Sequence, residues 1–269
     1  MPYRGLSEAE WSQMWLRQAE HNDVADLPRV ASAERQRLLH GVSGEQPMRG
    51  ALQFRRFVLD FIGAVGADAR LVDFGCGWGR HVRVFLKDFA PHNMFGVDID
   101  ADNIALCREL LPDVNFLRCQ EGAPLGIASG SVDLAISFSV FSHLSEASAR
   151  FWLNELARIT KPGGSIIVTS WGKALFDIVE RIKRTGETSV PWEHNIARAF
   201  VNFDEIGPRY AAGEYIFGRH GNSGSLDPDL YGISLMPKQW VERNAPVTLR
   251  AFVDDPKVLP QAVFCMTPR

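Results

Sequence analysis

Two acidic residues and a cluster of glycines are the groups in this chain whose types and spacing could do chemistry. The acids are Asp73 and Asp98, and the glycines that follow the first acid are Gly75, Gly77 and Gly79. Closely spaced glycines allow positive φ and let a ligand lie against bare backbone. A carboxylate beside such a turn can accept hydrogen bonds from both hydroxyls of a ribose. This pattern predicts a pocket for an adenosine-containing cofactor.

Two strands and a helix must position these groups. Residues 71–74 form a largely apolar run that is consistent with a central parallel strand. Residues 95–97 predict the next strand, which ends at Asp98, and residues 81–86 predict the helix that the glycine turn opens. The free N–H groups of that helix would point toward the ligand. Because open α/β sheets bind ligands at the carboxyl ends of their strands, both acids fall where a cofactor would bind.

The glycine spacing distinguishes two classes of cofactor. Dinucleotide-binding folds use G-x-G-x-x-G, which places the pyrophosphate on the helix N-terminus. Here the third glycine, Gly79, comes one residue early, and Arg80 occupies the position that the dinucleotide pattern requires. Asp73 adds an anion near the turn, which suits a cationic amino group better than a pyrophosphate. An oxidoreductase with an adenosine cofactor is therefore disfavoured.

With these residues, the chain resembles the class I S-adenosylmethionine-dependent methyltransferases. The resemblance continues through residues 130–137, which look like the family's fourth strand, and through residues 138–144. Residues 153–169 then look like its helix, Pro-Gly-Gly turn and fifth strand, so that roughly residues 67–171 are covered. The resemblance implies an α/β fold: a Rossmann-like, mostly parallel seven-stranded sheet with helices on both faces.

The regions around this core are expected to elaborate the fold. Residues 1–66 predict a helical amino-terminal cap, and residues 67–269 the methyltransferase domain, with a substrate-forming insertion at about 172–247. Residues 187–203 show no clean period. Further elements are expected as helices at 174–183 and 237–242, and as strands at 214–217, 248–253 and 261–266.

Two helices are expected within the cap. Residues 7–10 form a capping-box pattern before Trp11 and Trp15. A second apolar stripe predicts a helix over residues 48–65. The two tryptophans either pack in the core or form a lid or wall over a ligand.

The resemblance implies how S-adenosylmethionine would be held. Its methionine portion would contact the Asp73 carboxylate and the backbone of Gly75, Cys76 and Gly77. Its ribose would contact Asp98. The product S-adenosylhomocysteine would occupy the same site.

Five further residues are assigned in the same way. Ile99 would pack on the adenine face, and either Gln120 or Glu121 would reach the adenine amino group, although the family more often has Asp there. Phe138 would offer its backbone carbonyl to the methionine ammonium group. Arg49 would meet the cofactor carboxylate.

Structural alternatives exist for several of these residues. Asp98 could cap the helix that begins near Ala101, although Asp100 is the better candidate for that cap. Ile99 could be an ordinary core residue.

Transfer of a methyl group requires alignment of an acceptor and exclusion of water, and it requires no metal. If the acceptor is a hydroxyl, a general base helps. His143 is the first candidate, near the transferred methyl group, and His194 is the second, followed by His220 and Tyr231. His143 could instead cap a helix or be a satisfied structural group.

Composition favours a small-molecule enzyme. The net charge of the 269-residue chain is −3, and its basic residues are scattered, which argues against a nucleic-acid substrate. No apolar run approaches the roughly 18 residues that span a bilayer. The first residues lack the apolar segment of a signal peptide, and the four cysteines show no C-x-x-C spacing, so a cytoplasmic location is expected. The predicted function is methyl transfer to oxygen or nitrogen of a small molecule; the alternative is a non-catalytic binding or scaffolding protein.

Overall fold

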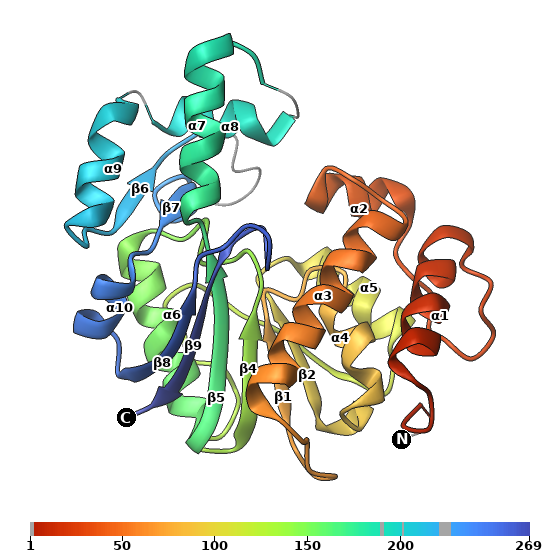
Figure 1. The fold of residues 1–269 in the computed structure, drawn as a ribbon. Helices are drawn as coiled ribbons and strands as arrows, with labels where there is room; N and C mark the ends of the chain where they lie inside the picture. The colour runs from red at the N-terminus through yellow and green to blue at the C-terminus, as the bar shows by residue number, and fades with distance from the viewer. Residues whose placement is uncertain (1–2, 189–190, 201, 221–226) are drawn as a thin grey trace. The chain divides into compact units, whose positions relative to one another are not determined.

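The computed structural model describes residues 3–188, 191–200, 202–220 and 227–269. Its main sheet contains β1 (Leu71–Phe74), β2 (Met94–Asp98), β3 (Asn115–Arg118), β4 (Val132–Ser137), β5 (Thr160–Ser170), β8 (Val247–Val253) and β9 (Ala262–Pro268). The strand order is β3-β2-β1-β4-β5-β9-β8 (Figure 1). β1 pairs in parallel with β2 and β4, and β2 with β3, whereas β9 runs antiparallel to β5 and β8. The predicted mostly parallel seven-stranded α/β fold is confirmed.

The described residues divide into two compact units. The first unit lies within Met1–Gly126 and Val132–Ile136, and the second within Ile127–Ser131 and Ser137–Arg269. The helices of the first unit are α1 (Glu8–His21), α2 (Ala33–His40), α3 (Glu45–Ile62), α4 (Arg80–Val84) and α5 (Ala101–Leu110), with 3-10 turns η1 (Phe85–Lys87) and η2 (Pro91–Asn93). Those of the second unit are α6 (Glu146–Ile159), α7 (Lys173–Thr185), α8 (Pro191–Ala199), α9 (Phe203–Ala211) and α10 (Lys238–Asn244).

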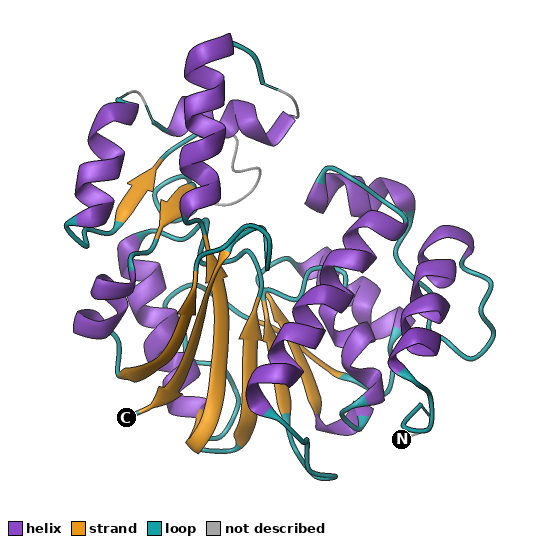
Figure 2. Cartoon of the chain, viewed as in Figure 1, coloured by secondary structure: helices purple, strands orange, loops and turns teal. Residues whose placement is uncertain are grey.

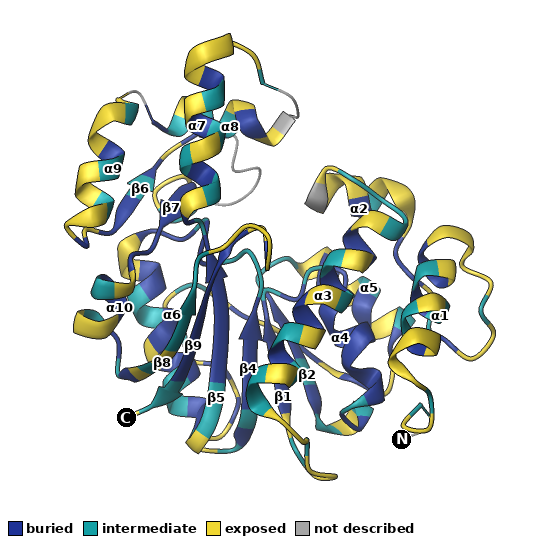
Figure 3. Ribbon diagram, in the orientation of Figure 1, coloured by how far each residue is buried: buried dark blue, intermediate teal, exposed yellow. Residues whose placement is uncertain are grey.

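Strands β1 and β4 form the buried centre of the first unit. All of β1 is buried, and β4 is buried at all but one position (Figure 3). A continuous apolar run of this kind is typical of a parallel strand that is covered on both faces. Helix α5 packs against β2 and β3, and its N-cap is Asp100, whose side chain accepts the N–H groups of Asp102 and Asn103. The helix predicted at 81–86 is present as α4 followed by η1.

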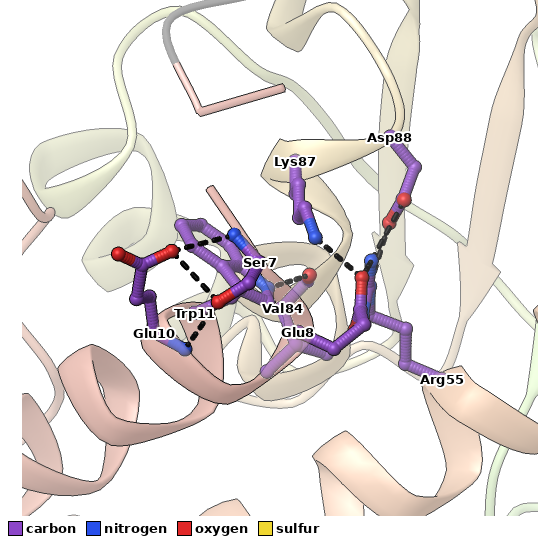
Figure 4. Close-up of polar contacts among 8 residues, drawn as sticks. All are labelled: Ser7, Glu8, Glu10, Trp11, Arg55, Val84, Lys87 and Asp88. Atoms are coloured by element: carbon purple, nitrogen blue, oxygen red, sulfur yellow. Dashed lines mark hydrogen bonds and ion pairs between the residues drawn. The ribbon is translucent and has the colours of Figure 1, made fainter. Parts of the chain in front are cut away.

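Helix α1 begins as the sequence predicts. The side chain of Ser7 accepts the N–H of Glu10, and the Glu10 carboxylate accepts the N–H of Ser7, so the capping box is complete. Trp11 and Trp15 both have 0% exposure, which confirms the core interpretation of these tryptophans. The indole N–H of Trp11 donates to the carbonyl of Val84 at 2.9 Å (Figure 4).

Charged groups also fasten α1 to the rest of the first unit. The Arg55 guanidinium, on α3, is 2% exposed and binds Asp88 at 2.6 Å and Glu8 at 2.5 Å (Figure 4). Lys87 binds the same Glu8 carboxylate, whose pKa is lowered to about 2 mainly by its hydrogen bond to Arg55.

The second predicted helix of the cap, expected at 48–65, is α3, which is displaced by three residues toward the N-terminus.

In the second unit, α6 packs against β5 and β9, and α10 packs against β8. Between them, β6 (Ile216–Gly218) and β7 (Ile233–Leu235) form a separate antiparallel pair (Figure 2). Their apolar side chains share a small core with α7, α8 and α9: Leu175, Val179, Ile196, Phe200, Ile206, Ile216, Ile233 and Leu235. The predicted division into cap, domain and insertion stays a prediction.

Candidate functional site

The glycine turn after β1 has the conformation that its sequence predicts. Gly75, Gly77 and Gly79 have φ values of 76°, 53° and 77°. The N–H groups of Gly75 and Cys76 both donate to the carbonyl of Val97, at 2.8 and 2.9 Å, which ties the turn to the end of β2.

The glycines of the turn differ in what surrounds them. A Cβ atom on Gly79 would lie 2.7 Å from the Arg83 guanidinium, so protein atoms fill that side of the turn. A Cβ atom on Gly77 would meet only the Leu39 side chain, at 3.8 Å. Gly77 is therefore a position at which a ligand can approach the backbone of the turn.

Asp73 is the most unusual polar group of the first unit. It lies on β1, is 1% exposed, and neither carboxylate oxygen has a hydrogen-bond partner. Burial raises the pKa of Asp73 to about 7; the charge of Arg80 lowers it, the charge of Asp98 raises it, and a weaker interaction with the Val82 backbone lowers it. A buried carboxylate without a donor is unfavourable. Its surroundings therefore favour a ligand that brings both a positive charge and N–H donors.

The Arg80 side chain forms no hydrogen bond with the Asp73 carboxylate. Its guanidinium donates to the carbonyl of Pro47 at 3.1 Å and lies 3.2 Å from a ring nitrogen of His81. Burial lowers the pKa of Arg80 to about 10, and the charge of Asp73 opposes that change.

Asp98 ends β2 and is 9% exposed. One oxygen accepts the N–H of Gly77 at 2.7 Å, and the other accepts the N–H of Asp100 at 2.9 Å. Burial raises the pKa of Asp98, and these bonds, with one from the Asn103 side chain, oppose the rise. The alternative in which Asp98 caps α5 is wrong, because the Asp100 side chain is the cap. The structure instead joins Asp98 to the glycine turn.

The other residues of the first unit that were predicted to contact the cofactor lie beside Asp98 or on the surface. Ile99 is partly buried, and the N–H of Cys119 donates to the carbonyl of Asp98, which brings the start of the 119–124 loop beside β2. Within that loop Gln120 is exposed and Glu121 is partly buried. Arg49 is exposed on α3 and forms an ion pair with Glu45 one turn away. The roles of these residues stay predictions.

Helix α2 is an element near the turn that the sequence interpretation missed. Arg35 donates to the side-chain oxygen of Asn103 at 2.6 and 3.0 Å and pairs with Asp100 at 3.3 Å. Because the N–H of Asp100 donates to the Asp98 carboxylate, α2 is linked through Asp100 to the end of β2. Ser32 before the helix and Gly41 after it are its caps, and this local pattern could have revealed it.

The remaining candidates belong to the second unit, where His143 meets two others. Nδ1 of His143 lies 2.9 Å from the carbonyl of Gly232, and since a carbonyl only accepts, this nitrogen carries the proton. The His143 ring stacks on Tyr231 at 4.9 Å, and the edge of His220 faces Tyr231 at 6.4 Å. Burial lowers the pKa of His143 to about 4, opposed by the bond to Gly232. The imidazole is therefore neutral at pH 7, with Nε2 as an acceptor.

His143 and His194 lie in different surroundings. His143 does not cap a helix, because α6 begins at Glu146 and is capped by Ser145. His194 is exposed on α8, where it bonds the Thr188 hydroxyl at 2.9 Å. Phe138 follows β4 and is partly buried. Among the residues that the structure describes, no group of His, Cys, Asp and Glu is arranged to hold a metal ion.

Comparison with known proteins identifies a domain within the chain. Residues 72–168, from β1 to β5, match the family described as "Methyltransferase domain". This match agrees with the resemblance of the chain to the class I S-adenosylmethionine-dependent methyltransferases. The cofactor of this family is S-adenosylmethionine, as the sequence predicts.

Individual relatives match only part of their own length. A mouse tRNA (carboxymethyluridine(34)-5-O)-methyltransferase, ALKBH8, is 31% identical over 115 residues, which cover 42% of this chain and 16% of that protein. A 2-methyl-6-phytyl-1,4-hydroquinone methyltransferase from Synechocystis is 28% identical over 144 residues, covering 49% of this chain and 44% of the relative. The chain thus spans less than half the length of either one.

A solved structure supports the fold over a larger part of the chain. The PH0226 protein from Pyrococcus horikoshii superposes with a TM-score of 0.56 at 18% identity, covering 84% of this chain and 92% of that one. At this identity the likeness concerns the fold alone.

No helix among the described ranges is long and apolar enough to cross a bilayer.

Proposed function

We propose that this protein transfers the methyl group of S-adenosylmethionine to an oxygen or nitrogen of a small molecule. The observation that carries the proposal is the Asp73 carboxylate, which is buried and has no hydrogen-bond partner beside an open glycine turn. S-adenosylmethionine is a cation at its ammonium and sulfonium groups, so it supplies what this carboxylate lacks. The match of residues 72–168 to a methyltransferase domain supports the same assignment.

Different residues of the first unit are proposed to contact different parts of the cofactor. In the proposal Asp73 and the backbone of Gly75, Cys76 and Gly77 hold the methionine portion. Asp98 accepts the ribose hydroxyls, a role supported by its place at the carboxyl end of β2 and by the backbone bonds that already fix it.

Four further assignments complete the proposed binding set. Ile99 packs on the adenine, Gln120 or Glu121 accepts from its amino group, and Arg49 meets the carboxylate, for which it would exchange its exposed pairing with Glu45. From the second unit, the carbonyl of Phe138 accepts from the ammonium group.

When S-adenosylmethionine is bound, its sulfonium group activates the methyl group and makes the rest of the cofactor a good leaving group. The protein then has to align the acceptor atom and exclude water. His143 is proposed to accept a hydrogen bond from the acceptor at Nε2, because Nδ1 is occupied by Gly232. Its lowered pKa, about 4, makes it a better orienting acceptor than a strong base. His194 is the weaker candidate, since it is exposed and bonds Thr188.

A small-molecule acceptor is favoured by charge. A net charge of −3 does not favour the binding of a polyanion. The Synechocystis relative is named for a hydroquinone acceptor, whereas the mouse relative is named for tRNA, and tRNA is therefore the competing acceptor class in the test. A cytoplasmic location is part of the proposal, because all four cysteines are unpaired thiols.

The test is calorimetric titration with S-adenosylmethionine and S-adenosylhomocysteine, followed by transfer of labelled methyl to metabolite and tRNA pools. Micromolar-range binding is expected for the natural sequence and for Asp113→Ala, an exposed control, and loss of binding for Asp98→Ala and Asp73→Asn, with melting curves confirming that each variant folds. Label in the metabolite pool supports the proposal, and label in tRNA alone contradicts the acceptor class. Binding without turnover on any pool would favour the non-catalytic scaffold.

A further inference from the structure

Ser139, just after β4, has a backbone conformation that few serines adopt. Its φ is 62°, in the left-handed region. Among the described residues the other non-glycine with positive φ is Asn22, which ends α1, where asparagine is common. Ser139 ends no helix. Such a conformation is unfavourable for a residue with a Cβ atom and persists where the surrounding structure imposes it.

A ring of hydrogen bonds imposes this conformation. The N–H of Ser139 donates to the Thr169 hydroxyl at 2.8 Å, and that hydroxyl donates to the side-chain oxygen of Gln261 at 2.7 Å. The amide nitrogen of Gln261 then donates back to the Ser139 hydroxyl at 2.9 Å, and that hydroxyl lies 3.2 Å from the hydroxyl of Ser142. The ring begins and ends at Ser139. It joins β5, the residue before β9 and the loop after β4.

The members of the ring are well placed to stay fixed. Thr169 has 0% exposure and Gln261 has 6%. The Thr169 oxygen that accepts from Ser139 uses its own proton on Gln261, and the Gln261 amide nitrogen donates to the Ser139 hydroxyl and, at 3.4 Å, to the Ser142 hydroxyl. Gln261 therefore has its oxygen toward Thr169 and its nitrogen toward Ser139.

This ring also fixes a carbonyl group. The peptide bond between Phe138 and Ser139 is trans, since the described residues contain no cis peptide bond. In a planar trans peptide the C=O points opposite to the N–H. The bond from the Ser139 N–H to Thr169 therefore sets the direction of the Phe138 carbonyl, and it also strengthens that carbonyl as an acceptor by polarising the peptide.

We propose that Thr169 and Gln261 are positioning residues that hold the Phe138–Ser139 peptide so that its carbonyl receives the ammonium group of the cofactor's methionine portion. The inference rests on the proposed function, in which the Phe138 carbonyl has that contact. It adds two residues that lie far from Phe138 in the sequence.

The test compares two ligands in a Thr169→Val variant. S-adenosylhomocysteine carries the ammonium group, and 5′-methylthioadenosine shares the adenosine and sulfur but lacks it. Calorimetry is expected to show about a tenfold loss of affinity for S-adenosylhomocysteine, as for a misdirected hydrogen bond to a charged group. Affinity for 5′-methylthioadenosine should change less than about twofold.

Matched variants separate positioning from stability. Thr160→Val removes another buried hydroxyl of β5, which bonds Leu156, and should leave both affinities unchanged. Thr169→Ser keeps the acceptor and should restore binding of S-adenosylhomocysteine. If Thr169→Val does not fold, Gln261→Met opens the ring at its second bond and should lose about threefold for S-adenosylhomocysteine alone.

Three results would overturn the proposal. Equal losses for both ligands in Thr169→Val would show a structural role, and no loss for either would show that the ring does not act on the cofactor. Failure of the natural sequence to bind either ligand would refute the proposed function itself, and the positioning role with it. A normal natural sequence with an unaffected variant refutes the positioning role alone.

Discussion

At the scale of single residues, Asp73 is held in a state that opposes the stability of the ligand-free protein. Its pKa of about 7 lies well above the ordinary value of 3.8, mainly because of burial. The folded protein therefore binds a proton at Asp73 between about pH 4 and pH 7 that the unfolded chain has released. By linkage, this group makes stability fall as the pH rises through that window, and the loss is complete above it.

Replacing the carboxylate by an amide should reverse this effect. Asp73→Asn is expected to raise the stability of the ligand-free protein at pH 8 by about 1–3 kcal/mol, with Arg80 limiting the gain because it loses its counter-charge. At pH 4 the difference should vanish. Melting curves across this range test it, with Asp113→Asn as the exposed control, and a variant that is less stable at pH 8 would contradict the argument.

Two glycines test the conformational demands of the loops. Gly79 and Gly122 both have positive φ, 77° and 72°. A Cβ atom on Gly79 meets Arg83, Cys107 and Leu111 within 3.3 Å, whereas one on Gly122 meets nothing within 4 Å. Gly122→Ala should cost about 1 kcal/mol, from the backbone alone, and Gly79→Ala about 2–4 kcal/mol. Denaturant unfolding measures both, and equal costs would show that crowding at Gly79 is relieved.

At the scale of elements, α1 is joined to the first unit by the buried Arg55 guanidinium, which pairs with Glu8, and not only by its tryptophans. Arg55→Leu leaves the largely buried carboxylate of Asp88 without a counter-charge, and should cost about 3–5 kcal/mol. Arg56→Leu changes the neighbouring side chain, which is 83% exposed, and should cost less than about 0.5 kcal/mol. Denaturant midpoints compare them, and similar costs would show that Arg55 contributes no more than a surface arginine.

Helix α2 provides a second prediction at this scale. Its Arg35 bonds Asn103 and Asp100, the residues that surround Asp98. Arg35→Met is expected to weaken binding of S-adenosylhomocysteine about three- to tenfold, because Asn103 loses the partner that orients its amide. Arg37→Met, on the exposed side of the same helix, should bind normally. Calorimetry decides, and equal affinities would remove α2 from the cofactor site.

The elements also show which parts of the fold a local pattern can predict. Strand β1, the glycine turn and α1 were predictable because apolar runs, glycines and a capping box act over a few residues. Helix α2 has no apolar stripe, and its bonds to Asn103 cross 68 positions. Helix α9 contains Pro208, and its buried residue Ile206 lies in a core that α9 shares with α7, α8, β6 and β7. Helix α9 depends on contacts that no short window contains, whereas α2 leaves only its two caps as a local signal.

The site divides in the same way. The positions of Asp73 and Asp98 followed from the family motif, yet the bond between Asp98 and the Gly77 amide, and the burial of the Asp73 carboxylate without a well-formed hydrogen bond, required the folded chain. The conformation of Ser139 depends on Thr169 and Gln261, which lie 30 and 122 residues away. A serine on its own predicts nothing of the kind.

At the scale of the whole molecule, binding of the cofactor should be visible as a gain in stability. A ligand present at 100 times its dissociation constant stabilises by about 2.7 kcal/mol. For a chain of this length that corresponds to a rise in melting temperature of about 5–10 °C. S-adenosylhomocysteine should produce this shift in a thermal melt. The same ligand should leave Asp98→Ala unchanged, and an equal shift in that variant would place the ligand elsewhere.

The four cysteines of the chain have a practical consequence. All are buried, and burial raises the pKa of Cys76, Cys119 and Cys265, so the reactive thiolate is scarce at each of them. Maleimide dyes should therefore react slowly with the native protein at neutral pH. Leu38 on α2 is 73% exposed, and Leu38→Cys would place a single fast-reacting thiol on the helix that Arg35 fastens beside Asp98. The natural cysteines could stay in place while a dye there follows the helix as ligands are added.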